Sequence, residues 1–197
     1  MIRLLVGLGN PTSRYEKTRH NAGFWFLDEV ARSLNVSFRE EGRFHGAVAK
    51  VEGRGDALVL LKPSTFMNRS GSAVLAAASY FKIAVDEILV VHDELDLSPG
   101  DVRLKKGGGH GGHNGLRDMV LHLKSADFYR IRLGIGHPGD RDQVANYVLD
   151  SPSKADGILI QGAIDRGIKV MPDIISGDYA RAMNELNART REKAKGD

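Results

Sequence analysis

The chain has 197 residues with a formal net charge of +3, and it contains no cysteine. This length favours one domain with a buried core, and the absence of cysteine excludes disulfides, thiolate zinc sites and a cysteine nucleophile. No apolar run approaches the ~18 residues of a membrane span, and the start lacks the pattern of a signal peptide, so we expect a cytoplasmic protein without a membrane partner. The mild positive charge permits an anionic partner such as RNA but does not by itself indicate one.

The first apolar run, at residues 2–6, leads into the sequence GLGNP, which is the pattern of a buried strand followed by a tight turn. The Gly-x-Gly matches a dinucleotide fingerprint only weakly, because Pro11 and Thr12 stand where that motif opens a helix and places its third glycine. Asn10 is the polar residue of this turn.

An amphipathic helix follows, with apolar residues at helical spacing at Phe24, Leu27, Ala31 and Leu34. Asn21 is its candidate N-cap. The cap would hold His20 at the positive end of the helix dipole, where a neutral, proton-accepting imidazole is favoured. A surface histidine at a helix start is the alternative.

The middle of the chain begins with two apolar runs, at residues 47–51 and 57–61, which flank turn residues and predict a hairpin. Pro63 ends the second strand, and an alanine-rich helix is expected at about residues 72–81. Between them, Phe66 and Met67 are most simply explained as core residues, and Asn68 as a cap of the helix.

A continuous apolar strand is predicted at residues 88–91, and His92 and Asp93 stand at its end. Another strand, at 102–105, runs into the sequence GGGHGGHNG at residues 107–115. Six glycines there surround His110, His113 and Asn114, which indicates a backbone that needs positive φ or lies very close to a ligand. A flexible glycine loop with incidental histidines is the alternative.

The last strand is expected at residues 129–135, with Arg130 and Arg132 at its polar positions. Helices are expected at residues 115–123, 153–170 and 179–194, and the charged tail from about residue 190 is expected to be frayed. The alternation of strands and helices predicts an α/β protein, a sheet with helices on its faces, formed by residues 1–197 as one domain.

Polar side chains follow four different predicted strands: Asn10, Asn68, Asp93 and the pair His113 and Asn114. Ligands of α/β sheets bind beyond the carboxyl ends of the strands, so we expect these side chains to line one cleft.

The chain lacks a GxSxG elbow, a phosphate-binding P-loop and an HExxH zinc motif. A histidine with a carboxylate partner suffices to activate water as a general base, and carboxamides can hold the water and polarise a carbonyl. These residues favour metal-free hydrolysis of an activated acyl bond, more readily an ester than an amide.

Seven motifs together resemble the bacterial-type peptidyl-tRNA hydrolases, in the same order and over nearly the whole chain. They are VGLGNP at Val6, TRHNAG at Thr18, FMNRSG at Phe66, HDELDL at His92, GGGHGGHNGLRD at Gly107, RIRLGIGHPG at Arg130 and ARAMNELN at Ala180. The resemblance implies a mixed, mostly parallel sheet surrounded by helices. It also implies a monomeric enzyme without cofactor or metal, which cleaves the ester between a peptide and the 3′ terminal ribose of tRNA.

The resemblance also implies roles for particular residues. His20 resembles the catalytic base and Asp93 its orienting partner, while Asn10, Asn68 and Asn114 resemble the groups that place peptide, ester and water. Substrate contacts are implied for Tyr15, Phe66, Met67 and His113, and phosphate contacts for Lys105 and Arg132, with Arg141 a weaker candidate. The chain departs from the family pattern at Ser98 and in a slightly short loop at residues 124–127, neither of which is a catalytic position.

Two other function classes remain open on the sequence. The fold of this family also occurs in non-catalytic RNA-binding relatives that act in organelle intron splicing. The histidines and Asp93 would also suit a metal-dependent peptidase, which resistance of the activity to chelators would exclude.

Overall fold

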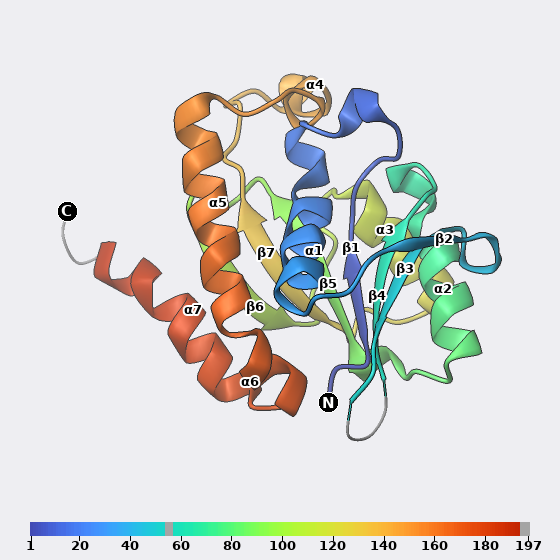
Figure 1. Ribbon diagram of the computed structural model, residues 1–197. Coiled ribbons are helices and arrows are strands. Elements are labelled where there is room, and N and C mark those ends of the chain that lie inside the picture. The colour runs from blue at the N-terminus through green and yellow to red at the C-terminus, as the bar shows by residue number, and fades with distance from the viewer. Residues whose placement is uncertain (54–56, 194–197) are drawn as a thin grey trace.

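The computed structural model describes residues 1–53 and 57–193. Its strands form one sheet in the order β2-β3-β4-β1-β5-β7-β6 (Figure 1). The four central strands, β4, β1, β5 and β7, run parallel, and β2, β3 and β6 add antiparallel pairings at the two sides. The mixed, mostly parallel sheet implied by the resemblance is confirmed. The strand bounds are β1 (Leu4–Gly7), β2 (Arg39–Glu41), β3 (Gly46–Val51), β4 (Leu58–Pro63), β5 (Ile88–Glu94), β6 (Val102–Lys106) and β7 (Tyr129–Gly134).

Helices cover both faces of the sheet (Figure 1). One face packs against α1, α5, α6 and α7, and the other against α2 and α3. The short helix α4 lies beside the segment that precedes α1. The helix bounds are α1 (Ala22–Ser33), α2 (Ser70–Tyr80), α3 (Asn114–Leu123), α4 (Val144–Leu149), α5 (Lys154–Lys169), α6 (Met171–Ser176) and α7 (Tyr179–Lys193).

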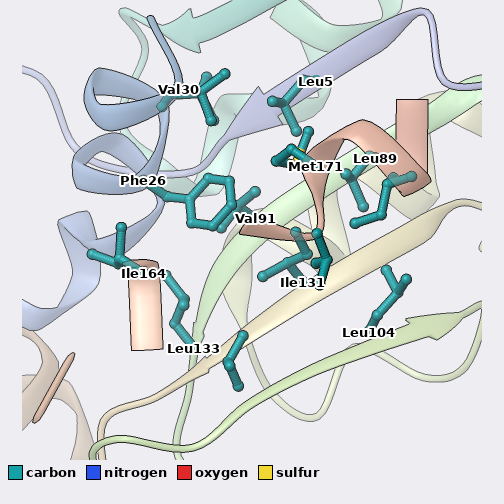
Figure 2. Packing of buried hydrophobic residues seen from close by; sticks show 14 of the residues in the cluster. Leu5, Phe26, Val30, Leu89, Val91, Leu104, Ile131, Leu133, Ile164 and Met171 are labelled. Carbon is teal, nitrogen blue, oxygen red and sulfur yellow. The ribbon is translucent and has the colours of Figure 1, made fainter. Parts of the chain in front are cut away.

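The larger apolar core lies between the sheet and α1, α5 and α6, where Phe26 and Ile164 meet Leu89, Val91 and Ile131 (Figure 2). Neighbouring strand residues alternate between this core and a second one under α2 and α3. The strands β1, β4 and β5 are therefore apolar on both faces over most of their length, which explains their continuous apolar runs, whereas β7 carries Arg130 and Arg132 on one face. Burying each such side chain stabilises the fold by about 1.5–3 kcal/mol.

The predicted strands and long helices are present, with small shifts at their ends. Three short elements were not predicted: β2, whose sequence REE is polar and largely exposed, α4, and α6, which carries Pro172 in its first turn. Residues 54–56 of the predicted hairpin turn and residues 194–197 of the predicted frayed tail lie outside the described residues. None of the described helices is long and apolar enough to cross a bilayer.

Two expectations for the loop after β4 need correction. Met67 is buried in the second core as expected, but Phe66 is 54% exposed and is not a core residue. Asn68 does not cap α2, because it lies in the single helical turn Met67–Arg69 and the N-cap position belongs to Arg69.

The glycine-rich stretch takes an unexpected path. The carboxyl ends of β4, β1, β5 and β7 lie at one end of the sheet, but β6 is antiparallel to β7, so its carboxyl end lies at the opposite end. The stretch therefore returns along the sheet to the start of α3. This return brings His113 and Asn114 to the cleft. The prediction that they lie there because they follow the carboxyl end of a parallel strand is wrong.

Candidate functional site

His20 reaches the end of β5 because the first turn of α1 lies directly on the sheet. Gly23 makes this approach possible, since a Cβ there would overlap the carbonyl oxygen of Val91 and the backbone of Leu8. Nδ1 of His20 lies 2.9 Å from Oδ2 of Asp93 and 3.0 Å from Oδ1. The expected contact between this histidine and this carboxylate is present, and both residues are buried.

Asn21 stands at the N-cap position of α1, but its side chain caps no helical amide. Instead, its Oδ1 accepts a hydrogen bond from the backbone N–H of Asn10 at 2.8 Å, and its Nδ2 donates to the carbonyl of Asn10 at 2.9 Å. The predicted capping role is wrong, and Asn21 holds the turn after β1 against the segment that carries His20.

The charge of Asp93 controls the protonation of His20. Burial lowers the pKa of His20, but the Asp93 carboxylate and its hydrogen bond raise it by more, so the net pKa lies above 6.5. Burial alone would raise the pKa of Asp93, but His20 and His113 hold that pKa well below 3.8. The expectation that the helix dipole keeps His20 neutral omitted this nearby carboxylate.

His113 is the second imidazole on Asp93. Its Nε2 lies 2.9 Å from Oδ1 of Asp93, and its Nδ1 accepts the backbone N–H of Leu116 at 3.4 Å as the N-cap of α3. Because Nδ1 accepts, the proton resides on Nε2, which donates to the carboxylate. The resemblance implied a contact with substrate for His113, and its contact with Asp93 was not foreseen.

His92 supports Asp93 from behind. Its ring is buried, and Nδ1 donates to the backbone carbonyl of Asp93 at 2.7 Å. Burial first, and then the neighbouring His113, lower the pKa of His92 to about 3, so this ring is neutral. Its Nε2 has no hydrogen-bond partner among the described residues.

Only the amide nitrogen of the Asn10 carboxamide is available to a ligand. Its Oδ1 accepts the backbone N–H of Met67 at 2.8 Å, and this donor identifies the oxygen. The amide nitrogen of Asn10 is therefore the group left to bind a ligand, and it can only donate.

A cavity of about 650 Å³ opens beyond the ends of β5 and β7. The predicted site residues His20, Asp93, His113 and Asn114 share its wall, and so does Arg141, the weaker candidate for a phosphate contact. The other lining residues are Glu94, Leu95, Asp96, His110, Gly111, Gly112, Arg117, His137, Val144, Ala145 and Val148. Five other predicted residues are not among the described residues that line this cavity: Asn10, Tyr15, Phe66, Met67 and Asn68. Of these, Tyr15 and Phe66 meet edge to face with ring centroids 6.3 Å apart, and Asn68 is exposed.

Lys105 and Arg132 lie on the paired strands β6 and β7. Their side chains are on the sheet face that α2 and α3 cover at the other strands. Arg103 stands directly opposite Arg132, and Lys105 opposite Arg130, so four cations share this face. The Nε of Arg132 lies 2.8 Å from Glu94. Burial, followed by the charges of Arg132 and Arg130, lowers the pKa of Lys105, and Lys105 has no ion-pair partner among the described residues.

Arg130 anchors the glycine-rich stretch, a role the sequence did not reveal. Its guanidinium donates to the carbonyls of Gly108 and Gly109 at 2.6 and 2.7 Å, while its side chain is buried. The available signal was its position in RIRLG, where a charge alternates with apolar strand residues and so needs a buried partner. Gly108 has a φ of 95°, a conformation that glycine adopts without strain from a side chain.

Three side chains could hold a metal ion. The ligand atoms of His20, Asp93 and His113 all lie within 4.8 Å of one another.

Together, the fold and the site define an α/β enzyme whose cleft lies beyond the carboxyl ends of parallel strands and contains a buried carboxylate between two imidazoles. The family model described as peptidyl-tRNA hydrolase matches residues 4–195. The chain belongs to the peptidyl-tRNA hydrolase family.

Relatives and solved structures agree with this assignment over the whole fold. The chain is 52% identical to the peptidyl-tRNA hydrolase of Coxiella burnetii, covering 95% of this chain and 98% of that protein. It is 55% identical to the peptidyl-tRNA hydrolase of Alcanivorax borkumensis, covering 94% and 96%. The crystal structure of peptidyl-tRNA hydrolase from Acinetobacter baumannii superposes with a TM-score of 0.92 at 45% identity, covering 95% of each chain.

Proposed function

We propose that the protein hydrolyses the ester bond between tRNA and a peptide or an N-blocked amino acid, releasing free tRNA for reuse in translation. The observation that carries the proposal is the His20–Asp93 pair at the wall of the cleft, in a chain that belongs to this family. We further propose that residues 1–197 act as one monomeric domain in the cytoplasm, where the enzyme rescues tRNA from peptides released prematurely by ribosomes.

In the proposed mechanism, the Nδ1–H group of His20 donates a hydrogen bond to the Asp93 carboxylate, which leaves Nε2 as the basic nitrogen. Nε2 accepts a proton from water as the water attacks the ester carbonyl, and the imidazolium that forms is stabilised by the carboxylate. The lowered pKa of Asp93 supports this role, because the carboxylate stays ionised while the ring gains its charge. The leaving ribose hydroxyl then takes a proton from the same ring.

The carboxamides and aromatic rings have supporting roles in this proposal. Asn114 at the start of α3 and Asn68 hold the water and the ester, while the amide nitrogen of Asn10 donates to a carbonyl of the peptide. The exposed ring of Phe66 and the half-buried ring of Tyr15 offer an aromatic surface to the peptide beside Met67. His113 keeps the carboxylate oriented while its ring borders the substrate.

We assign tRNA binding to the cations of the β6–β7 pair. Lys105 and Arg132 lie on one face with Arg103, and this positive surface suits phosphates. Such contacts position the tRNA without reading its sequence, as an enzyme that accepts many tRNAs requires.

Turnover of an N-acetylated aminoacyl-tRNA by the purified protein tests the proposal. We expect cleavage that resists chelators, and we expect His20→Ala to lower the single-turnover rate by ~100-fold to 10,000-fold, which is the usual contribution of a positioned general base. Circular dichroism and thermal melting serve as controls for folding. A folded His20→Ala protein with a normal rate would refute the assignment, and a wild-type protein that binds tRNA without cleaving the ester would indicate a binding module.

A further inference from the structure

The cluster around Asp93 has the donor set of a zinc site. Zinc sites that bind a reacting group commonly use three protein ligands of imidazole and carboxylate type and leave a fourth position open. Nδ1 of His20 and Nε2 of His113 approach the same carboxylate oxygen at 3.0 and 2.9 Å. Tetrahedral zinc with bonds of 2.0–2.1 Å requires ligand atoms about 3.3 Å apart. The two N···O distances therefore need to widen by a few tenths of an ångström, and the two ring nitrogens, which lie within 4.8 Å of each other, need to approach.

An ion can reach these ligands and keep its fourth position open. All three residues line the cavity of about 650 Å³. The backbone of Asp93 is also held in place, since its carbonyl accepts a hydrogen bond from His92.

Two imidazole protons oppose binding, because zinc requires the lone pair of each nitrogen. On His113 the proton must move from Nε2 to Nδ1, and Nδ1 then no longer accepts the amide of Leu116. This hydrogen bond measures 3.4 Å and is weak, so breaking it costs little. Zinc binding should therefore leave a local sign at the first turn of α3.

We infer that His20, Asp93 and His113 form an inhibitory Zn²⁺ site, in which the ion binds Nδ1 of His20, the Asp93 carboxylate and Nε2 of His113. The expectation that zinc inhibits rests on the proposed function, in which His20 acts as the base. An imidazole bound to the metal through Nδ1 carries its proton on Nε2, so His20 can no longer accept a proton from water. The ion also occupies the carboxylate that orients the ring.

Calorimetric titration of the metal-free protein with zinc chloride tests the site without any substrate. We expect one equivalent to bind, and His113→Asn to weaken binding by at least about tenfold, since even outer-shell changes at metal sites cost 10–100-fold. Asparagine is a good N-cap, so this variant keeps the start of α3. The matched control is His45→Asn, which removes an exposed histidine at a left-handed position that asparagine tolerates. Magnesium, which prefers oxygen ligands, should not compete.

Two further readouts complete the test. In amide NMR spectra, zinc should shift the Leu116 signal in the wild type and not in His113→Asn. In the esterase assay, zinc should inhibit the wild type, and a chelator should restore the rate. Zinc that binds His113→Asn as well as it binds the wild type, or that does not bind at all, would overturn the site.

The two proposals can fail separately. A protein that binds zinc as described but never cleaves peptidyl-tRNA refutes the proposed function and leaves the site standing. A protein that cleaves the ester but binds no zinc refutes only the site. A rate that rises with added zinc would overturn the inhibition.

Discussion

Asp93 accepts hydrogen bonds from two imidazoles, and this determines how His20 titrates. The base must be neutral to accept a proton, so the rate should rise with pH through the pKa of His20. Burial lowers this pKa and Asp93 raises it by more, which places the midpoint above 6.5. In Asp93→Asn the burial acts unopposed, so we expect the midpoint to fall below 6.5 and the maximal rate to drop. The pH dependence of single-turnover rates measures both effects.

The same shifts fix the sign of the pH dependence of stability. The raised pKa of His20 contributes stability that is complete below pH 6.5 and is lost as the pH rises through the folded-state pKa. The lowered pKa of Asp93 contributes stability that is present above pH 3.8 and is lost as the pH falls through its folded-state value. If Asp93→Asn left the midpoint of the pH–rate profile unchanged, this electrostatic account would be contradicted.

Asn10→Asp tests how the enzyme recognises a blocked amino group. The aspartate can keep the hydrogen bond from Met67 but replaces the donating nitrogen by a negative oxygen. It should repel the carbonyl of an N-acyl group and attract the free ammonium of an ordinary aminoacyl-tRNA. We expect the ratio of kcat/KM for N-acetylated over free aminoacyl-tRNA to fall. An unchanged ratio would mean that Asn10 does not read this group.

At the scale of elements, the contact between α1 and the sheet depends on one glycine. In Gly23→Ala the new Cβ would overlap backbone atoms of β5 and of Leu8, which cannot move as a side chain can. We expect a loss of ~1–3 kcal/mol in the free energy of unfolding from overpacking, with a loss of activity because His20 moves. Urea denaturation measures the first effect.

Gly157→Ala in α5 is the control for this substitution. The nearest atom to its new Cβ is 4.0 Å away, so the higher helix propensity of alanine should stabilise the protein by up to ~1 kcal/mol. If Gly23→Ala were as stable as Gly157→Ala, the close approach would not be limiting.

Elements with long apolar runs could be predicted from the sequence, and the short elements β2, α4 and α6 could not. The strands at the centre of the sheet are apolar on both faces, and their pattern survives small errors in the bounds. The strand β2 has no apolar alternation, and its pairing with β3 alone defines it.

For the site, motifs indicated the residues but not their connections. The contact of His20 with Asp93 followed from the resemblance, and its catalytic role remains a prediction. The second imidazole on Asp93 depends on the antiparallel direction of β6, which local sequence does not encode. The side chain of Asn21 was assigned to the nearest amides along the chain, whereas it bonds to the turn eleven residues earlier.

At the scale of the whole molecule, a net charge of +3 is too small for the protein surface as a whole to attract tRNA strongly. The affinity for tRNA therefore depends on where the positive charges are placed. Removing one phosphate-binding cation should flatten the slope of log affinity against log salt by ~0.7–0.9. We expect Lys105→Gln with Arg132→Gln to weaken binding of intact tRNA and flatten this slope, with little effect on a minimal ester substrate.

Lys50→Gln is the control for this experiment, because β3 lies toward the opposite side of the sheet from β6 and Lys50 is exposed. It should leave the slope unchanged. A decrease of the same size on the minimal substrate, or in the Lys50 variant, would place the tRNA surface elsewhere.

The strand order also has a consequence for synthesis of the chain. β7 is the last strand to be made, yet it lies inside the sheet, between β5 and β6. Until residue 134 has left the ribosome, the strand that carries Asp93 has β1 on one side but lacks β7 on the other, and this edge exposes unpaired backbone groups, which are prone to pair with other chains. Nascent or truncated chains that end before this point should therefore depend on chaperones, even though His20, Asp93 and His113 have already been synthesised.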